Sequence, residues 1–375
     1  MNVEIEPVHT SKQRLAFIRV PWPLYRDDPA WVPPLIFDRK GALDPHHPFF
    51  AHAQWQGFLA VVNGRPVGRI SAQIDRLNDA QGRGDLGYFG MIEAIDDPAV
   101  FGALFEAAEG WLRAAGKTRC AGPLNLGINQ EVGLLVDGFD TPPYFMMGHA
   151  RPYYGPRIEA LGYGKAVDVL AYEMDPDFQI PTVMGAIERR LAERMVVRPI
   201  DRKRRDDELR TLCDIFNDAW ANNWGFVPFT EAEFLAIGRE MLMLIDDDYI
   251  QIAEVDGEPA AFIVMLPNIN AAIGDLDGRL LPFNWLKLLW RLKVRPPTSA
   301  RVPLMGVRQR YQKTRLGPGL AFAVIHAVRN ACVARGVEHV EMSWILEGNQ
   351  GMRNIIETIG GRVSKRYRLY ERRLV

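Results

Sequence analysis

The sequence predicts an α+β protein (α/β layered) of two tandem domains, each with a mixed, largely antiparallel sheet flanked by helices. One observation is a pair of hairpin signatures, since apolar runs flank Asn63-Gly64 in the first half and Asp256-Gly257 in the second. Such dipeptides favour tight hairpin turns because their residues tolerate positive φ angles. A second observation is that an apolar helical pattern in each half stops at a glycine, Gly116 or Gly336, as helices commonly do.

A third observation is a direct match between the ends of the two halves. The segment RIEALGYGKAVDVLAYE (157–173) aligns with NIIETIGGRVSKRYRLYE (354–371). The matched pairs stand 198 positions apart: Ile158 and Ile356, Gly162 and Gly360, Tyr172 and Tyr370, Glu173 and Glu371. The hairpin turns are 193 positions apart and the helix-ending glycines 220. These changing intervals indicate two copies of one unit that differ by insertions and deletions.

Each copy is predicted to run hairpin, strand, helix, strand, helix, strand. The first copy places a helix between Asp97-Pro98, which are good helix-start residues, and Gly116. The segment MDPDFQIPTVMGAIERRLAERMVVRP suits a connector because it combines prolines with a charged helical stretch. We therefore expect domains at 1–178 and 179–375, the second carrying an insertion at 280–297.

Composition excludes several functional classes. The 375 residues are 48% hydrophobic with a formal net charge of −1, which argues against a general nucleic-acid binder. The cysteines Cys120, Cys213 and Cys332 are far apart and odd in number, so a disulfide framework or a metal site is not expected. The charged N-terminus does not resemble a signal peptide and no run of about 18 apolar residues occurs, which predicts a cytoplasmic protein.

The turn RQRYQKTRLGPG joins a predicted strand to a predicted helix in copy two. A glycine-containing turn at a helix start directs free N–H groups at one point and can bind an anion. Gly317 and Gly319 would let the backbone approach a phosphate closely. Basic side chains would add attraction for a diphosphate: Arg308, Arg310, Lys313 and Arg315. The alternative is a solvated basic turn that only connects two elements.

This order of elements resembles the GNAT acyltransferase superfamily, in which the pattern [Q/R]-x-x-G-x-[G/A] holds the coenzyme A pyrophosphate. Residues 312–317 fit if Arg315 replaces the first glycine, and 314–319 fit in a shifted register. The resemblance implies acyl-CoA as cosubstrate and an Asn before the last helix, here Asn349. The family's frequent helix tyrosine is replaced by Ile355 or Ile356, which leaves that role unassigned. The implied cofactor contacts are Val307, Gln312, Lys313, Thr314, Arg315, Leu316, Gly317, Pro318, Gly319 and Asn349.

Copy one differs at the corresponding turn, where Asp96 and Asp97 would repel a diphosphate. It carries instead a long loop, residues 120–163, rich in glycine and proline. Long ordered loops usually carry function, and we expect this one to line a site for the amine substrate. The candidates are Asn125, Asn129, Glu131, His149, Tyr153 and Tyr154. The alternative is that each only stabilises a turn or the core.

Longer motifs carry a more specific resemblance. The chain contains PWPLYRDDPAWVPPL, HPFFAHAQWQGFLAVVNGRPVGRISA, GYFGMIEAIDD, GPLNLGINQEVGLLVDGFDTPPYFMMGHARPYYGPRIEALGY and FNDAWANNWGFVPFTEAEF. These motifs resemble the bacterial ceramide synthase family, and the resemblance covers nearly the whole chain. It implies N-acylation of a sphingoid base, sphinganine or 3-ketosphinganine, from a fatty acyl thioester carried by coenzyme A or by acyl carrier protein. It does not identify catalytic residues.

Amide formation from a thioester needs a neutral amine, a stabilised oxyanion and a protonated leaving thiol. The candidate bases are Glu341, on the same strand face as His339 and Ser343, together with Glu93 and His149 of copy one. The alternative for each glutamate is a salt-bridged surface carboxylate. Tyr311 is a candidate acid or pantetheine contact, and the oxyanion is expected to bind a backbone N–H near Val307.

The insertion LLPFNWLKLLWRLKVRPP (280–297) combines leucine and tryptophan with basic side chains. Read as a helix, it suits a segment that lies on the anionic inner membrane surface. It could equally be a core-packing helix with extended lysines, or the wall of an acyl tunnel.

Two other functions stay open. A cell-wall type aminoacyl transferase would favour a coiled-coil arm and a basic groove, and neither is evident in the sequence. A non-catalytic lipid-binding protein on a degenerate acyltransferase scaffold would account for the imperfect glycine loop.

Overall fold

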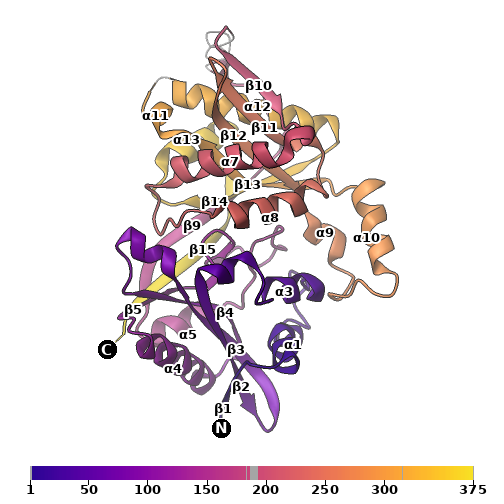
Figure 1. Cartoon of the computed structure of the whole chain (residues 1–375). Helices are drawn as coiled ribbons and strands as arrows, with labels where there is room; N and C mark the ends of the chain where they lie inside the picture. The colour runs from indigo at the N-terminus through magenta and orange to yellow at the C-terminus, as the bar shows by residue number, and fades with distance from the viewer. Residues whose placement is uncertain (1, 183, 186–192, 315, 375) are drawn as a thin grey trace. The chain divides into compact units, whose positions relative to one another are not determined.

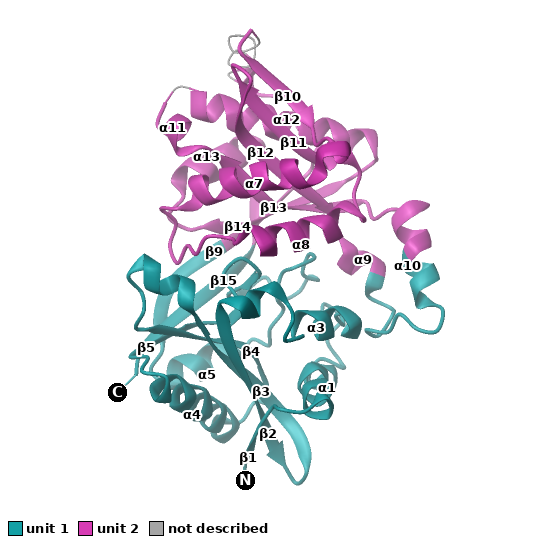
Figure 2. Cartoon of the chain, viewed as in Figure 1, with its two compact units in different colours: residues 1–169, 273–288, 365–375 teal, residues 170–272, 289–364 magenta. Residues whose placement is uncertain are grey.

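The computed structural model describes residues 2–182, 184–185, 193–314 and 316–374, and Figure 1 follows the chain through them. The chain divides into two compact units, coloured separately in Figure 2. Unit 1 comprises residues 1–169, 273–288 and 365–375, and unit 2 comprises 170–272 and 289–364. The division falls inside β9, α10 and β15, so each of these elements contributes residues to both units.

The first unit is built on a mixed sheet in which β4 and β5 are parallel and the other neighbouring strands are antiparallel. Its strand order is β1-β2-β3-β4-β5-β15. The β2–β3 turn contains Asn63 at φ 50° and Gly64 at φ 72°, as the hairpin signature predicts. Helix α4 begins at its N-cap Asp97 and buries Phe101, Leu104 and Phe105. The elements are β1 (Glu4–Pro7), α1 (Ser11–Arg19), α2 (Pro21–Leu24), α3 (Ile36–Ala42), β2 (Ala53–Val62), β3 (Arg65–Asp75), β4 (Leu86–Ala94), α4 (Pro98–Ala114), β5 (Arg119–Gly122), β6 (Leu124–Asn125), β7 (Glu131–Val132), β8 (Leu134–Asp137), α5 (Tyr154–Ala160) and β9 (Gly164–Met174).

The second unit repeats this plan in the strand order β10-β11-β12-β13-β14. Its hairpin turn contains Asp256 at φ 53° and Gly257 at φ 84°. Within the described part of the chain, α12 alone is long and apolar enough to span a bilayer, but it is largely buried and packs on β11 and β12. The elements are β10 (Met195–Pro199), α7 (Arg205–Trp220), α8 (Glu231–Leu242), β11 (Ile250–Val255), β12 (Glu258–Pro267), α9 (Ile269–Ile273), α10 (Asn284–Lys293), β13 (Ser299–Val307), α11 (Gln309–Gln312), α12 (Leu316–Ala334), β14 (His339–Leu346), α13 (Gln350–Thr358) and β15 (Arg362–Arg373).

The matched positions at the ends of the two copies play matched structural roles. Ile158 and Ile356 are both fully buried. Gly162 and Gly360 both take positive φ, at 86° and 95°, in the turn that follows the last helix of each copy. Tyr172 and Tyr370 are buried in the closing strands β9 and β15. The repeat and the α+β fold class are therefore confirmed.

The last strand of the chain completes the sheet of unit 1. Residues 370–373 of β15 pair antiparallel with residues 119–122 of β5, and residues 366–368 pair with β8. Lys365 on the same strand is buried, and its ammonium donates to the carbonyl oxygens of Gly138 and Thr141. The contiguous domains 1–178 and 179–375 stay a prediction from the repeat, while the compact units are assembled from separate segments.

Each unit contains a parallel strand pair that is bonded only at its start. In unit 2, β13 pairs with β14 from Ser299↔His339 to Val302↔Met342, and both strands then continue. In unit 1, β4 pairs with β5 from Leu86↔Arg119 to Tyr88↔Ala121, although β4 continues to Ala94. Separating strands expose backbone groups, so these two openings are where a ligand could bind the sheet.

Candidate active site

The opening in unit 2 presents backbone N–H groups of β13. Arg308 N donates to Ala260 O at 2.9 Å, which assigns the even-numbered positions here to the β12 ladder. Strand alternation therefore turns the N–H groups of Met305 and Val307 away from β12. Two side chains agree with this direction: Trp220 Nε1 donates to Met305 O at 2.9 Å, and Gln312 Nε2 donates to Val307 O at 2.8 Å. The N–H of Val307, the expected oxyanion donor, therefore points away from β12, and its role stays a prediction.

The turn after β13 contains the short helix α11 rather than one open loop. Gln312, a predicted phosphate contact, also donates to Ala219 O at 3.0 Å, so its amide holds the turn to α7. Thr314 Oγ1 donates to Tyr311 O at 2.7 Å and accepts from Leu316 N at 3.1 Å, which caps the start of α12. Tyr311 lies between these groups, half-buried, beneath the guanidinium of Arg310.

Gly317 is required by packing within this turn. A Cβ added there would lie 2.7 Å from Tyr311 O and 2.9 Å from Gln312 O, both of them backbone atoms. Pro318 and Gly319 follow in the first turn of α12. Arg315 lies outside the described residues.

Only part of the predicted basic charge is available to a ligand. Arg308 forms an ion pair with Asp214 at 2.6 Å and donates to Pro259 O, so its guanidinium is largely committed. Arg310 and Lys313 are exposed. Asn349 accepts from Met352 N at 3.1 Å and caps α13, which gives it a structural role.

Glu341 is buried at the paired base of the unit 2 opening. It is the register partner of Arg301, and the two side chains lie 3.7 Å apart. Ser343 donates to Glu341 and accepts from Arg301 Nε, so the strand-face prediction for Glu341 and Ser343 is correct. His339, two residues earlier, is exposed. The alternative of a surface carboxylate is wrong for Glu341, which has 0% exposure, but the ion pair commits its charge to Arg301.

The opening in unit 1 is filled by the chain itself. Asn125 Oδ1 accepts from Met91 N at 2.7 Å, and Gln73 donates to Leu124 O. Leu124 O approaches Gly90 so closely that a Cβ there would lie 1.8 Å away. The β4 edge that corresponds to the Met305–Val307 edge of unit 2 is therefore occupied by residues 124–125.

The helix start beside that opening is also occupied. Asp97 caps α4 by accepting from Ala99 N at 2.7 Å, and Asp96 forms an ion pair with Arg157 at 2.8 Å. A carboxylate already interacts with the N–H groups that would bind a phosphate. Both features agree with the prediction that copy one does not bind coenzyme A in the GNAT manner.

Glu93 lies at the centre of a polar cluster in unit 1. Its carboxylate accepts from Tyr25 OH and Tyr154 OH, both at 2.8 Å, and lies 3.8 Å from Arg69. The side chain is 12% exposed. Burial raises the pKa of Glu93, and the nearby Arg69 opposes that rise. Burial also raises the pKa of Tyr25 well above its ordinary value, so this phenol stays protonated as a donor.

A second carboxylate extends the cluster. Glu131 accepts from Asn125 Nδ2 at 2.8 Å and pairs with Arg39. Burial opposes its charge, but Arg39 and Asn125 together lower the pKa of Glu131. The loop candidates Asn125 and Glu131 therefore meet near Glu93, as electrostatic coupling of the two carboxylates shows.

His149 and Tyr153 lie at the edge of the same cluster. His149 Nε2 lies 3.1 Å from Asp28 Oδ2, its ring is 5.6 Å from the Tyr25 ring, and burial lowers its pKa. Tyr153 OH donates to Ala94 O at 2.7 Å. Asn129 is half-buried in the turn before β7.

Sequence reasoning missed several members of this cluster: Tyr25, Asp28, Arg39, Arg69 and Arg151. All but Arg151, which lies in the loop itself, come from the first 70 residues, far along the chain from the loop candidates. Their signal lay in the quoted motifs: PWPLYRDDPAWVPPL contains Tyr25 and Asp28, and two longer motifs contain Arg69 and Arg151.

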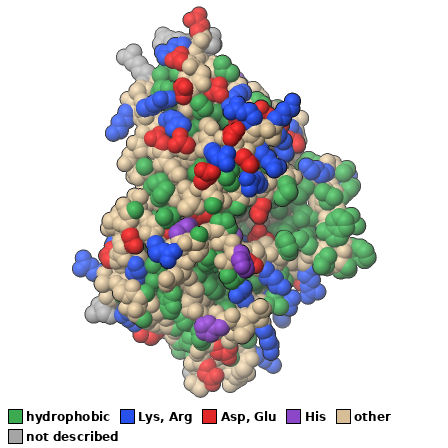
Figure 3. Space-filling view, viewed as in Figure 1, with side chains coloured by type: hydrophobic (Ala, Val, Ile, Leu, Met, Phe, Trp, Pro, Cys, Tyr) green, Lys and Arg blue, Asp and Glu red, His purple; other side chains and the backbone are tan. Residues whose placement is uncertain are grey.

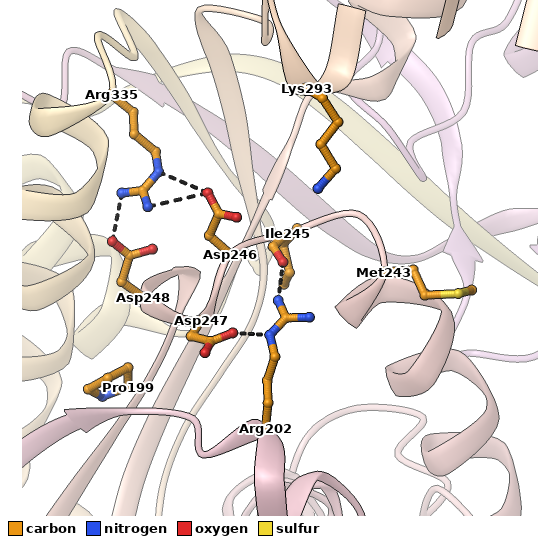
Figure 4. A pocket seen from close by; sticks show the side chains of 9 residues that line it. All are labelled: Pro199, Arg202, Met243, Ile245, Asp246, Asp247, Asp248, Lys293 and Arg335. Carbon is orange, nitrogen blue, oxygen red and sulfur yellow. Dashed lines mark hydrogen bonds and ion pairs between the residues drawn. The ribbon is translucent and has the colours of Figure 1, made fainter. Parts of the chain in front are cut away.

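A separate surface hollow of about 440 Å³ in unit 2 contains no predicted site residue (Figure 4). Its charges pair with one another: Arg202 with Asp247, and Arg335 with Asp246 and Asp248. Among the residues that the structure describes, no cluster of three or more His, Cys, Asp or Glu could hold a metal ion.

The chain is 49% identical over 376 residues to a protein named bacterial ceramide synthase from Caulobacter vibrioides, covering 100% of this chain and 98% of that protein. The chain belongs to the bacterial ceramide synthase family. A second relative, protein YghO of Escherichia coli, is 50% identical over 360 residues, which cover 96% of this chain and 92% of that one. No family model matches the sequence.

Solved structures similar to this ceramide synthase family member establish its fold. A tandem GNAT protein from the clavulanic acid biosynthesis pathway superposes with a TM-score of 0.57 at 13% identity, covering 100% of this chain and 99% of that chain. A GCN5-related N-acetyltransferase from Sphaerobacter thermophilus gives 0.54 at 12% identity, covering 99% and 96%. The tandem GNAT fold is confirmed, and family and fold together make the chain an N-acyltransferase.

Proposed function

We propose that the protein transfers a fatty acyl group from acyl-CoA to the amine of a sphingoid base, sphinganine or 3-ketosphinganine, and so forms a ceramide. The observation that carries the proposal is the 49% identity, over the full chain, to a protein named bacterial ceramide synthase. The asymmetry of the two openings supports it. Unit 2 keeps an open β13 edge beside a basic turn, and unit 1 fills its edge and holds a buried polar cluster instead.

In this proposal unit 2 binds the thioester. The pyrophosphate lies against the start of α12 and against the exposed Lys313 and Arg310, with Gly317 allowing the tight turn. The N–H of Val307 donates to the thioester oxygen as it gains charge in the tetrahedral intermediate. Of the remaining predicted contacts, Gln312, Thr314, Leu316, Pro318, Gly319 and Asn349 shape the turn or the adjoining helix start rather than bind directly, and Arg315 stays a predicted phosphate contact.

The amine nitrogen forms a bond to the carbonyl carbon and the C–S bond breaks. The nitrogen loses two protons overall, one to make the free amine and one after attack, and the departing thiolate takes one. We propose Glu93 as the base, because its raised pKa lies closer to neutral pH than that of an ordinary glutamate. Tyr311, beside the phosphate turn, is the proposed acid for the thiolate. His149 pairs with Asp28, which suits it to position Tyr25 rather than to act as base.

The polar head of the sphingoid base is proposed to bind at the unit 1 cluster. Glu131 and Asn125 offer acceptors for an ammonium or hydroxyl group, and Tyr153, Tyr154 and Asn129 line the same region. Acyl carrier protein is an alternative donor with the same thioester arm. Since both substrates carry long chains, we place the reaction in the cytoplasm, at the inner face of the inner membrane.

A direct assay tests the proposal. The purified full chain is incubated with sphinganine or 3-ketosphinganine and with acyl-CoA of short, medium and long chain, and the amide is measured by mass spectrometry. Formation of a ceramide with at least one donor is the expected result. If no amide forms with any acyl-CoA or with acyl carrier protein thioesters, the proposed function is wrong.

A further inference from the structure

The segment around α10 presents an apolar surface to solvent. Along residues 281–294, the large apolar side chains are mostly exposed, Leu281 by 77%, Phe283 by 73% and Val294 by 63%. Trp285, Leu286, Leu289 and Trp290 are each about half exposed. Figure 3 shows these side chains as a continuous green area over α10. We call this set, residues 281, 283, 285, 286, 289, 290 and 294, the α10 patch.

Helix α10 exposes most of its large apolar side chains, unlike a helix that covers a core. No residue of α10 is buried. Its inner side includes Arg291, which donates to Ala272 O at 2.6 Å, while Lys287 forms an exposed ion pair with Asp275 at 2.5 Å. Leu288 and Leu292 are half-buried on that side. A surface helix of a soluble protein usually places its apolar stripe inward, so the interpretation of α10 as a core-packing helix is wrong.

The connection that leads into α10 is held in place by specific contacts. Trp22 Nε1 donates to Asp277 Oδ1 at 2.7 Å, and Ile36 N donates to Gly278 O at 2.9 Å. A Cβ at Gly278 would lie 2.7 Å from Pro34 O and from the Trp22 ring. Phe37, next to Ile36, is another exposed apolar side chain. These contacts fix the connection before α10. The exposure of the apolar side chains that follow it is therefore a fixed feature of the fold.

Charge identifies the surface that the patch fits. Residues 279–295 contain five basic side chains and no acidic one: Arg279, Lys287, Arg291, Lys293 and Arg295. Arg279, Lys293 and Arg295 are exposed, and the Arg295 guanidinium lies over the Trp290 ring. Tryptophan beside leucine, flanked by cations, is typical of helices that lie in the headgroup region of an anionic bilayer.

We propose that the α10 patch docks the enzyme on an anionic phospholipid bilayer, with Trp285, Leu289 and Trp290 inserted among the headgroups. The proposal deepens the proposed function, since a sphingoid base and a long-chain ceramide both partition into that bilayer. The contact is reversible and peripheral. It brings the enzyme to the bilayer both when it takes up the sphingoid base and when it releases the ceramide.

The test is sedimentation of the purified full chain with vesicles of phosphatidylglycerol and phosphatidylethanolamine, compared with phosphatidylcholine alone. The variant Trp285→Ser, Leu289→Ser, Trp290→Ser is expected to bind anionic vesicles about tenfold or more weakly. These side chains are half exposed, so the substitutions leave the core intact. The matched control changes three other exposed apolar residues to serine: Val196, Val333 and Val363. It is expected to bind like the wild type.

Tryptophan fluorescence and acyl transfer complete the test. Wild-type emission should shift to shorter wavelength on anionic vesicles and not on phosphatidylcholine. The α10 variant should keep its rate with detergent-solubilised substrate and lose rate with vesicle-bound substrate. Equal vesicle binding by variant and wild type overturns the proposal, as does a patch-dependent dimer in sedimentation velocity without vesicle binding. Because sedimentation needs no catalysis, patch-dependent binding without amide formation would refute only the proposed function.

Discussion

The carboxylates of Glu93 on β4 and Glu341 on β14 have different surroundings. That difference separates their expected roles. Glu93 accepts from two phenols and has Arg69 at 3.8 Å, whereas Glu341 is the direct partner of a buried arginine. A general base needs a charge that can accept a proton, and an ion pair opposes protonation. We therefore expect the two substitutions to glutamine to differ in what they damage.

Glu93→Gln is expected to lower kcat by about 100-fold or more, the usual contribution of a positioned base, with little change in KM for acyl-CoA. Steady-state kinetics on the pure variant measures both constants. Glu106→Gln, on the exposed face of α4, is the control and should keep full activity. A Glu93→Gln enzyme with normal kcat would exclude Glu93 as base.

Glu341→Gln is expected to lower the free energy of unfolding by about 3–5 kcal/mol, because it leaves the buried Arg301 charge without its partner. Urea unfolding followed by circular dichroism measures the loss. If stability is unchanged while kcat collapses, Glu341 is the base and the assignment to Glu93 is wrong.

The raised pKa of Glu93 also predicts a pH dependence. A base acts when deprotonated, so kcat/KM should fall as pH drops through the raised pKa, above the ordinary value of about 4.3 for glutamate. The contribution of Glu93 to folding stability changes with pH in the opposite direction to that of a salt-bridged carboxylate. The folded state holds this proton more tightly than the unfolded state, so the contribution is present at low pH and is lost as pH rises through the folded pKa. A pH–rate profile whose acid limb lies at or below ordinary glutamate values would contradict this account.

A matched pair of glycines tests the turn before α12: Gly317 belongs to this turn, and Gly348 lies in the turn before α13. Gly317→Ala places a Cβ against the backbone carbonyls of residues 311 and 312, so the turn must shift. We expect KM for acyl-CoA to rise about tenfold or more, a loss comparable to one good phosphate contact. Gly348→Ala, which meets nothing within 4 Å, should change neither constant. An unchanged KM in Gly317→Ala would remove this turn from the thioester site.

At the scale of elements, β15 makes the longest-range connection along the chain. Its residues 365–373 belong to unit 1, whose main segment is residues 1–169. Leu369 is fully buried there. Leu369→Ala should lower the free energy of unfolding by about 2–5 kcal/mol, since it leaves a cavity. Arg362→Ala on the exposed start of the same strand should change it by no more than about 0.5 kcal/mol. Chemical unfolding of both variants distinguishes a structural strand from a loosely attached tail.

The repeat could be predicted from sequence because hairpin turns and helix-ending glycines are local signals. Asn63-Gly64 and Gly162 identify their own turns without reference to distant residues. The unit 1 cluster could be predicted only in part. Asn125, Glu131 and Tyr154 lie in the long loop that the sequence singled out. Tyr25 and Arg39 contact this cluster from the N-terminal helices, and no sequence pattern predicts those contacts.

The same limit applies to α10. Its composition predicts an amphipathic helix, but composition does not say which side faces the protein. The bond from Arg291 to Ala272 O and the partial burial of Leu288 and Leu292 show which side faces the protein. The sequence also gives no sign that the opening of unit 1 is filled. Contacts in the structure reveal it, among them the approach of Leu124 O to Gly90.

At the scale of the whole molecule, we expect the chain to fold as one system, because unit 1 is assembled from separate segments. Neither of the fragments 1–178 and 179–375 contains the complete set of segments of unit 1. We expect fragment 1–178 alone to be degraded rapidly by limited proteolysis, and co-expression with 179–375 to restore resistance. A stable, cooperatively unfolding fragment 1–178 would refute this expectation.

The place of β15 has a consequence for how a cell makes this protein. Chains commonly fold from the N-terminus while the ribosome is still adding residues. Here unit 1 combines the first 169 residues with residues 365–375, which are synthesised about 200 residues later. Strand β5 therefore lacks its antiparallel partner until β15 has been made. We therefore expect a stop codon placed just before residue 365 to leave an edge of the first-made sheet unpaired and to destabilise unit 1.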